Sequence, residues 1–273
     1  MARNRLLKIS IAFLISSTVG ILPSIADTPL DLQSAAAQPA LVHVSGDTIY
    51  YQGNLSESST TAFRAAVAGI KRGQLTRLVI SSVGGDTRAG IEIGTWVHDM
   101  SLVVEVEKIC FSSCANYIFP AGSSKVIRTN AFVGWHGNVR GFAIDAEQRG
   151  VTLQSEFKKM LPAEILEGPP EALAEAVAQM MDSATKSAIE EAKYFSLLGL
   201  NDAFSVCAVG DVSSAKFPDL KDKRGWGFSV EDMNRLGLKK TTYQGDGAYE
   251  KNSAYFVKYL ALLSAADCLS LLK

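Results

Sequence analysis

Short apolar strands alternate with helices of about ten residues between Leu41 and Trp135, and this alternation constrains the fold more than any other feature. The helices show apolar residues at i, i+3, i+4 and i+7, as at Phe63, Ala66, Val67 and Ile70. Alternation of this kind indicates βαβ crossovers around a largely parallel sheet. The sequence therefore predicts an α/β core whose functional groups lie at the C-terminal ends of the strands. Strands are expected at 41–44, 48–52, 77–81, 102–110, 125–128 and 131–135.

The second half of the chain has a different pattern. One long helix is expected over 170–198, where apolar side chains repeat along one side. From residue 203 onward, glycine-containing and charged stretches interrupt short segments. We therefore expect a domain over 41–205 followed by a C-terminal extension over 206–273, for which the sequence suggests no role.

The N-terminus has the order of segments typical of a secretory signal peptide. Three basic residues precede an apolar run from Ile9 to Leu22, and Ser24 and Ala26 place small residues before a cleavage point. The run has about 14 residues, whereas a membrane-spanning helix needs roughly 20. We expect a signal peptide over 1–26, a flexible lead-in over 27–40, export to the periplasm or outside the cell, and no stable membrane anchor after cleavage.

Composition narrows the classes of partner. With 47% hydrophobic and 20% charged residues, the chain is typical of a globular protein. Its formal net charge is −1, and removal of three basic residues with the signal peptide makes the exported chain more acidic. No stripe of Lys and Arg predicts a nucleic-acid partner. The three histidines have no metal-ligand spacing, so we expect neither a metal nor a cofactor.

The chain has four cysteines, Cys110, Cys114, Cys207 and Cys268. An oxidising compartment favours disulfides over free thiols, and four cysteines allow three pairings. The favoured pairing joins Cys110 to Cys114, which are neighbours, and Cys207 to Cys268, which bracket the C-terminal segment.

Three segments at predicted strand ends could meet in one site: 81–86, 110–115 and 134–137. The middle segment places a serine at the start of a helix, where free N–H groups favour developing negative charge. The first segment supplies a glycine turn with further N–H donors for an oxyanion. His136 ends a strand and is suited to act as the base for acyl transfer. His43 and His98 are interpreted as structural or solvent-facing.

The stretch from Ile80 to Asn138 resembles the Clp protease proteolytic subunit and its crotonase-fold relatives, especially exported ClpP-like proteins. The residues Ser82-Val83-Gly84-Gly85 are similar to the family's Ser-Pro-Gly-Gly turn, with valine in place of proline. The stretch Ser113 to Gly122 is similar to the nucleophile helix, and Trp135-His136 to the strand end that carries the family's histidine. The resemblance implies a spiral of βαβ units and self-association into a homo-oligomer.

The resemblance also implies roles for individual residues. Ser113 would be the nucleophile, His136 the general base, and the N–H groups of Gly85 and Cys114 the oxyanion hole. Ser112 is the alternative nucleophile, because an adjacent Ser-Ser pair is ambiguous in sequence. Asp182 would complete the triad, although it lies one residue away from the family's spacing.

The sequence therefore favours an exported ClpP-like serine hydrolase, a peptidase that acts on a peptide or protein substrate. The alternative is a catalytically inactive relative that uses the fold for binding or assembly. Acyl-CoA chemistry is disfavoured, because coenzyme A is not expected outside the cytoplasm. An α/β-hydrolase is also disfavoured, because no Gly-X-Ser-X-Gly motif occurs. A Clp-type unfoldase partner is not expected for an exported chain.

Overall fold

The computed structural model describes residues 40–209 and 216–271 of the chain. The expected signal peptide lies outside the described residues, as does all of the expected lead-in except Ala40. None of the helices in the described part of the chain is both long and apolar enough to cross a membrane.

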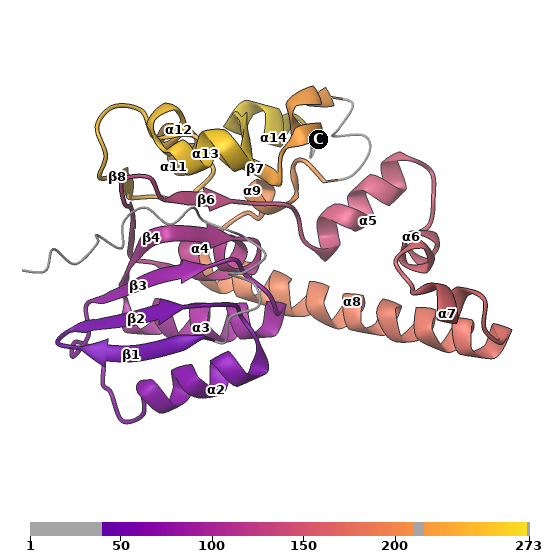
Figure 1. Ribbon diagram of the computed structural model, residues 1–273, viewed down its shortest axis with the longest axis horizontal. Coiled ribbons are helices and arrows are strands. Elements are labelled where there is room, and N and C mark those ends of the chain that lie inside the picture. The colour runs from indigo at the N-terminus through magenta and orange to yellow at the C-terminus, as the bar shows by residue number, and fades with distance from the viewer. Residues whose placement is uncertain (1–39, 210–215, 272–273) are drawn as a thin grey trace, which may run out of the picture. The chain divides into compact units, whose positions relative to one another are not determined.

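A seven-stranded sheet forms the centre of the fold (Figure 1). Its order is β1-β2-β3-β4-β5-β8, with β6 paired to the far end of β4. The β1–β2 hairpin is antiparallel, and all the other pairs in this sheet are parallel. The strands are β1 (Leu41–Ser45), β2 (Thr48–Gln52), β3 (Arg77–Ser82), β4 (Val103–Phe111), β5 (Ser124–Ile127), β6 (Phe132–Gly134) and β8 (Thr241–Tyr243). The α/β fold class expected from the sequence is confirmed.

Two helices return the chain between the first parallel strands. Helix α2 (Glu57–Ala66) begins at a capping box formed by Ser56, and α3 (Thr87–Met100) begins at Asp86, whose carboxylate accepts a hydrogen bond from the N–H of Ala89. The apolar side of α3 is buried, with Ile93 and Val97 fully covered. After β4 the chain enters a π-helical turn, η2 (Cys114–Ile118), which continues into α4 (Phe119–Ala121).

Four helices follow β6: α5 (Val139–Gln148), α6 (Leu153–Lys159), α7 (Ala163–Leu166) and α8 (Pro170–Leu198). Helix α8 begins beside α7 and ends beside α3 (Figure 1). The sequence predicted the bounds of α8 correctly. They are set by Pro170 in the first turn and by Gly199, which adopts a left-handed backbone after the last turn.

The residues after α8 pack into the same core as those before it. Strand β8 joins the edge of the main sheet beside β5. Strands β7 and β9 form a second, two-stranded parallel sheet, which an antiparallel bridge between Trp226 and Trp135 connects to the end of β6. The boundary expected after Ser205 falls inside helix α9. The elements of this region are α9 (Ala203–Val206), η3 (Pro218–Asp222), β7 (Gly225–Phe228), α11 (Val230–Arg235), α12 (Tyr249–Asn252), α13 (Ala254–Tyr259), β9 (Leu260–Leu263) and α14 (Ala265–Leu271).

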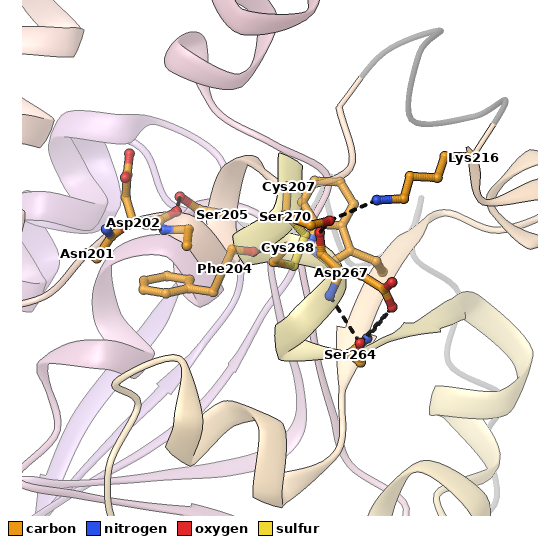
Figure 2. The surroundings of a disulfide bond; sticks show 12 residues. Asn201, Asp202, Phe204, Ser205, Cys207, Lys216, Ser264, Asp267, Cys268 and Ser270 are labelled. Carbon is orange, nitrogen blue, oxygen red and sulfur yellow. Dashed lines mark hydrogen bonds between the residues drawn. A yellow bond between two sulfur atoms is a disulfide. The ribbon is translucent and has the colours of Figure 1, made fainter. Parts of the chain in front are cut away.

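Both predicted disulfides are present. The bond between Cys110 and Cys114 links the end of β4 to η2. The bond between Cys207 and Cys268 links the end of α9 to α14 (Figure 2). The start of α14 is further fixed by Ser264, whose hydroxyl oxygen accepts a hydrogen bond from the N–H of Asp267 at 3.1 Å. The second disulfide therefore attaches the last described helix to the segment that follows α8.

Candidate active site

The turn between β4 and η2 has an unusual backbone. Ser112 adopts a φ of 56°, which is left-handed and uncommon for a residue with a side chain. Gly84 lies directly against this turn, since a Cβ atom added to Gly84 would come within 2.5 Å of the Phe111 carbonyl oxygen. The disulfide between Cys110 and Cys114 closes the turn from its two ends. Glycine packing and a covalent bond thus hold Ser112 in a backbone conformation that it would rarely adopt alone.

Ser112 and His136 form the central contact of the site. The Nε2 atom of His136 lies 2.6 Å from the Oγ atom of Ser112. The two residues meet because β6 pairs with the end of β4, placing Gly134 opposite Phe111 in the sheet. The Phe111 ring also packs beside the imidazole, with 5.2 Å between ring centroids.

The protonation state of His136 suits a base. The residue is exposed at the surface, but protein packed around the imidazole displaces water, and this desolvation lowers the pKa of His136 from its ordinary value. A lowered pKa keeps the ring neutral at neutral pH. A neutral ring nitrogen can accept a proton from the Ser112 hydroxyl.

Ser113, the nucleophile preferred from the sequence, has a different hydrogen-bond partner. Ser113 is 5% exposed, and its hydroxyl donates a hydrogen bond to the carbonyl oxygen of Gly85 at 2.7 Å. The left-handed backbone at Ser112 turns the two adjacent side chains in different directions. His136 is therefore brought together with Ser112, the alternative nucleophile of the sequence prediction.

Backbone donors lie beside this contact. Of the hydrogen bonds found among residues 40–209 and 216–271, none uses the N–H of Gly85, Ser113 or Cys114. Gly85 has a φ of 139°, and an added Cβ atom would lie 2.2 Å from the Leu55 carbonyl oxygen, so only glycine fits there. Gly84 approaches the Ser113 nitrogen from the other side of the turn, because its added Cβ atom would lie 2.8 Å from that nitrogen. The glycine turn and the start of η2 thus meet beside Ser112.

The structure does not bring Asp182 to this site. Its side chain is 62% exposed on α8, where the carboxylate pairs with Lys186 at 2.7 Å. In the described part of the chain, no hydrogen bond or ion pair connects Asp182 with His136. Helix α8 continues unbroken through this position, so the carboxylate stays on the solvent side of the helix.

Sequence reasoning missed a buried carboxyl group next to the site. Glu191 is 4% exposed, and it accepts hydrogen bonds from the Tyr117 hydroxyl at 2.8 Å and from Asn138 Nδ2 at 2.9 Å. The pKa of Glu191 is raised to about 7, chiefly by burial and also by the negative charge of Asp202. The available signal was its helical spacing, since Glu191 follows Ala184 by seven residues along the buried side of α8.

A cavity of about 710 Å³ opens between α5, α6 and α8. Its wall is largely apolar, and Glu191 lies in it together with Arg140 and Asp202, which are bonded to one another. The remaining lining residues are Val139, Ala143, Leu153, Ala184, Thr185, Ala188, Ile189, Ala192, Phe195, Ser196, Leu200 and Asn201.

Comparisons with known proteins find a likeness at the level of structure alone. No protein family and no curated protein sequence matches the chain. One similar solved structure is a methylmalonyl-CoA decarboxylase, with 10% identity, coverage of 58% of this chain and 90% of the other, and a TM-score of 0.31. Another is an enoyl-CoA hydratase from Thermoplasma volcanium, with 13% identity, coverage of 62% and 94%, and a TM-score of 0.30. A third similar solved structure is a protein from Rhodopseudomonas palustris, with 13% identity and a TM-score of 0.29. The likeness covers 46% of this chain and 54% of the other, so this chain spans about half the length of that protein.

These neighbours are proteins of the crotonase fold. At TM-scores near 0.3, the likeness carries no argument about the activity, substrate or assembly of this chain.

Proposed function

We propose that the protein is a serine hydrolase in which Ser112 is the nucleophile and His136 the general base. The observation that carries the proposal is the 2.6 Å contact between Ser112 Oγ and His136 Nε2. It is supported by the left-handed turn that presents Ser112. It is also supported by N–H groups at the start of a helical turn that have no hydrogen-bond partner among residues 40–209 and 216–271, since such groups stabilise a developing negative charge.

The chemistry follows from this arrangement. His136 takes the hydroxyl proton as Ser112 Oγ attacks a carbonyl carbon, and the N–H groups of Gly85 and Ser113 bind the resulting oxyanion. The imidazolium then gives its proton to the leaving group, and an acyl group remains on Ser112. Water, deprotonated by His136, releases this acyl group as a carboxylic acid and restores the serine. Since the nucleophile is Ser112, the second oxyanion donor moves from Cys114 to Ser113.

The substrate class rests on the resemblance between 78–138 and ClpP-like proteins. On that basis we propose a peptidase, exported after cleavage of residues 1–26, which acts on a peptide or protein as a homo-oligomer. The two disulfides suit an oxidising compartment.

A second candidate is a non-catalytic module that binds ligands or partners at the same surface. One observation favours it: among the described residues, no carboxylate is found in contact with His136. A carboxylate on the second ring nitrogen stabilises the imidazolium in a Ser-His-Asp triad. Without it, the Ser112–His136 pair would react more slowly or act only in recognition.

Labelling with a fluorophosphonate separates the two candidates. The probe should label a protein that spans residues 27–273, and Ser112→Ala should abolish labelling. Ser113→Ala is the matched control and should keep it, because the Ser113 hydroxyl is bonded to the Gly85 carbonyl. If no labelling occurs between about pH 6 and 9, the hydrolase proposal fails and the binding module is favoured.

A further inference from the structure

We propose that Glu191 is a positioning residue for His136. Through Asn138, Glu191 holds the segment that carries His136, and it does so more firmly when its carboxylate is ionised. The inference deepens the proposed function and rests on it for the role of His136. In the part of the chain that the structure describes, no hydrogen bond or ion pair joins Glu191 to Ser112 or His136, so its effect must pass through the segments that carry these two residues.

Asn138 is the first link. It follows His136 by two residues, and its Nδ2 atom donates to Glu191 Oε2 at 2.9 Å. Its other amide atom, Oδ1, accepts from the N–H of Gly141 at 3.0 Å and thereby caps helix α5. Both ends of the Asn138 side chain are thus used, and Glu191 fixes the segment immediately after the histidine.

The second link runs to the helical turn beside Ser112. Tyr117 donates its hydroxyl to Glu191 Oε1 at 2.8 Å, and Tyr117 belongs to η2, which begins two residues after Ser112. In the same turn, Asn116 Nδ2 donates to the carbonyl oxygen of Gly137 at 3.2 Å. One carboxyl group therefore joins the segment of the proposed base to the segment of the proposed nucleophile.

The protonation state of Glu191 changes this link. An ionised carboxylate accepts from both Tyr117 and Asn138, whereas a protonated one must donate from one oxygen. The Asn138 amide nitrogen cannot accept that proton. Protonation on Oε2 breaks the hydrogen bond from Asn138. Protonation on Oε1 reverses the bond with the Tyr117 hydroxyl and leaves Oε2 as an uncharged, weaker acceptor for Asn138. In both cases ionisation of Glu191 strengthens its bond to the His136 segment.

The groups around Glu191 place its ionisation near neutral pH. The pKa of Glu191 is raised to about 7 in total: burial and the Asp202 carboxylate raise it, whereas the hydrogen bond from the Tyr117 hydroxyl and the Arg140 guanidinium lower it. Glu190, the neighbour on the same helix, points instead to Arg88 at 3.4 Å and is 42% exposed. Because Glu191 also lines the cavity between α5, α6 and α8, protons can reach it from solvent.

The first test measures the rate of fluorophosphonate labelling against pH for the exported chain, residues 27–273. The labelling rate of wild type should rise with pH in two steps. The lower step comes from deprotonation of His136, whose pKa lies below its ordinary value, and the upper step, near pH 7, from ionisation of Glu191. Glu191→Gln should lose the upper step and stay roughly three- to tenfold below the wild-type rate at high pH, because small displacements of a catalytic group are costly. Glu190→Gln, the matched control, should follow the wild-type curve.

The second test needs no chemistry at Ser112. The Cε1 proton of His136, assigned by its absence in His136→Gln, should show a second inflection near pH 7 in NMR spectra of wild type. This inflection should vanish in Glu191→Gln and in Asn138→Ser, which keeps a capping oxygen for α5, adds no titratable group and removes the amide donor to Glu191.

The outcomes keep the two proposals apart. Absence of labelling in wild type, with the second His136 inflection present, defeats the hydrolase and retains the link between Glu191 and His136. Labelling with the same pH profile and the same His136 curve in wild type and Glu191→Gln overturns the positioning role. If Glu191→Gln does not fold, Asn138→Ser decides the question by the same NMR measurement.

Discussion

The Oγ atom of Ser112 lies 2.6 Å from the Nε2 atom of His136, although the two residues are 24 positions apart in the chain. Strand pairing produces this contact, since β6 lies beside the end of β4 and each residue follows its own strand. The neighbouring hydroxyl of Ser113 is bonded elsewhere, to the Gly85 carbonyl. The site therefore depends on the backbone of a short turn as much as on the identity of its side chains.

Gly84→Ala should disrupt that turn. The added Cβ atom would meet the Phe111 carbonyl oxygen at 2.5 Å, and the φ of 89° is unfavourable for alanine. We expect fluorophosphonate labelling to fall at least about tenfold, as a displacement of Ser112 by a fraction of an ångström suffices for such a loss. Gly46→Ala is the control, because it also has a positive φ but open space around it, and it should label like wild type. Equal labelling of the two variants would contradict the role of Gly84.

The two disulfides should have separable effects. Replacement of both Cys207 and Cys268 by alanine opens a bond with a sequence separation of 61 residues, and should lower the free energy of unfolding by about 2–4 kcal/mol. Replacement of Cys110 and Cys114 removes a bond across only 4 residues, and should reduce labelling more than it reduces stability. Urea unfolding and fluorophosphonate labelling of the two double variants test this contrast. An equal loss of labelling in the two variants would contradict it.

Stability should depend on pH through Glu191. Its pKa is raised in the folded protein, so the folded state binds an extra proton between the ordinary carboxyl range and about pH 7. The free energy of unfolding should therefore fall as pH rises through this window and level off above it. Urea unfolding of wild type and Glu191→Gln should show this slope in wild type only. A parallel slope in both proteins would mean that another group causes it.

Asp182→Asn should leave the site unaffected. The side chain is exposed and pairs only with Lys186 in an i,i+4 contact on α8, so the change in stability should stay within about 0.5 kcal/mol. Labelling at neutral pH should equal that of wild type. A loss of labelling above about tenfold would show that Asp182 reaches His136 in solution and acts as the triad acid.

Local patterns were sufficient to predict much of the fold. Helix α8 was predicted with its observed bounds, because Pro170 and Gly199 mark its ends and apolar spacing continues between them. The Cys110–Cys114 bond followed from proximity in sequence and from the expected compartment. The helical turn expected after β4 is also present, at Cys114–Ile118.

Features that depend on tertiary contacts could not be predicted from the sequence. The contact between Ser112 and His136 depends on a left-handed φ at Ser112, in a turn that packs against Gly84 from another strand end. In the sequence, Glu191 has no feature that distinguishes it from other helical glutamates. Its role depends on tertiary contacts with Tyr117 and Asn138. Strand β8 has only three residues, and its place in the sheet follows from pairing with β5.

The position of the fluorophosphonate adduct tests the central claim most directly. The labelled protein, residues 27–273, would be reduced and digested, and the peptide that contains both Ser112 and Ser113 would be fragmented in a mass spectrometer to locate the phosphonyl group. The contact with His136 predicts the adduct on Ser112. An adduct on Ser113, or an unmodified peptide after exposure to the probe at neutral pH, would contradict the account.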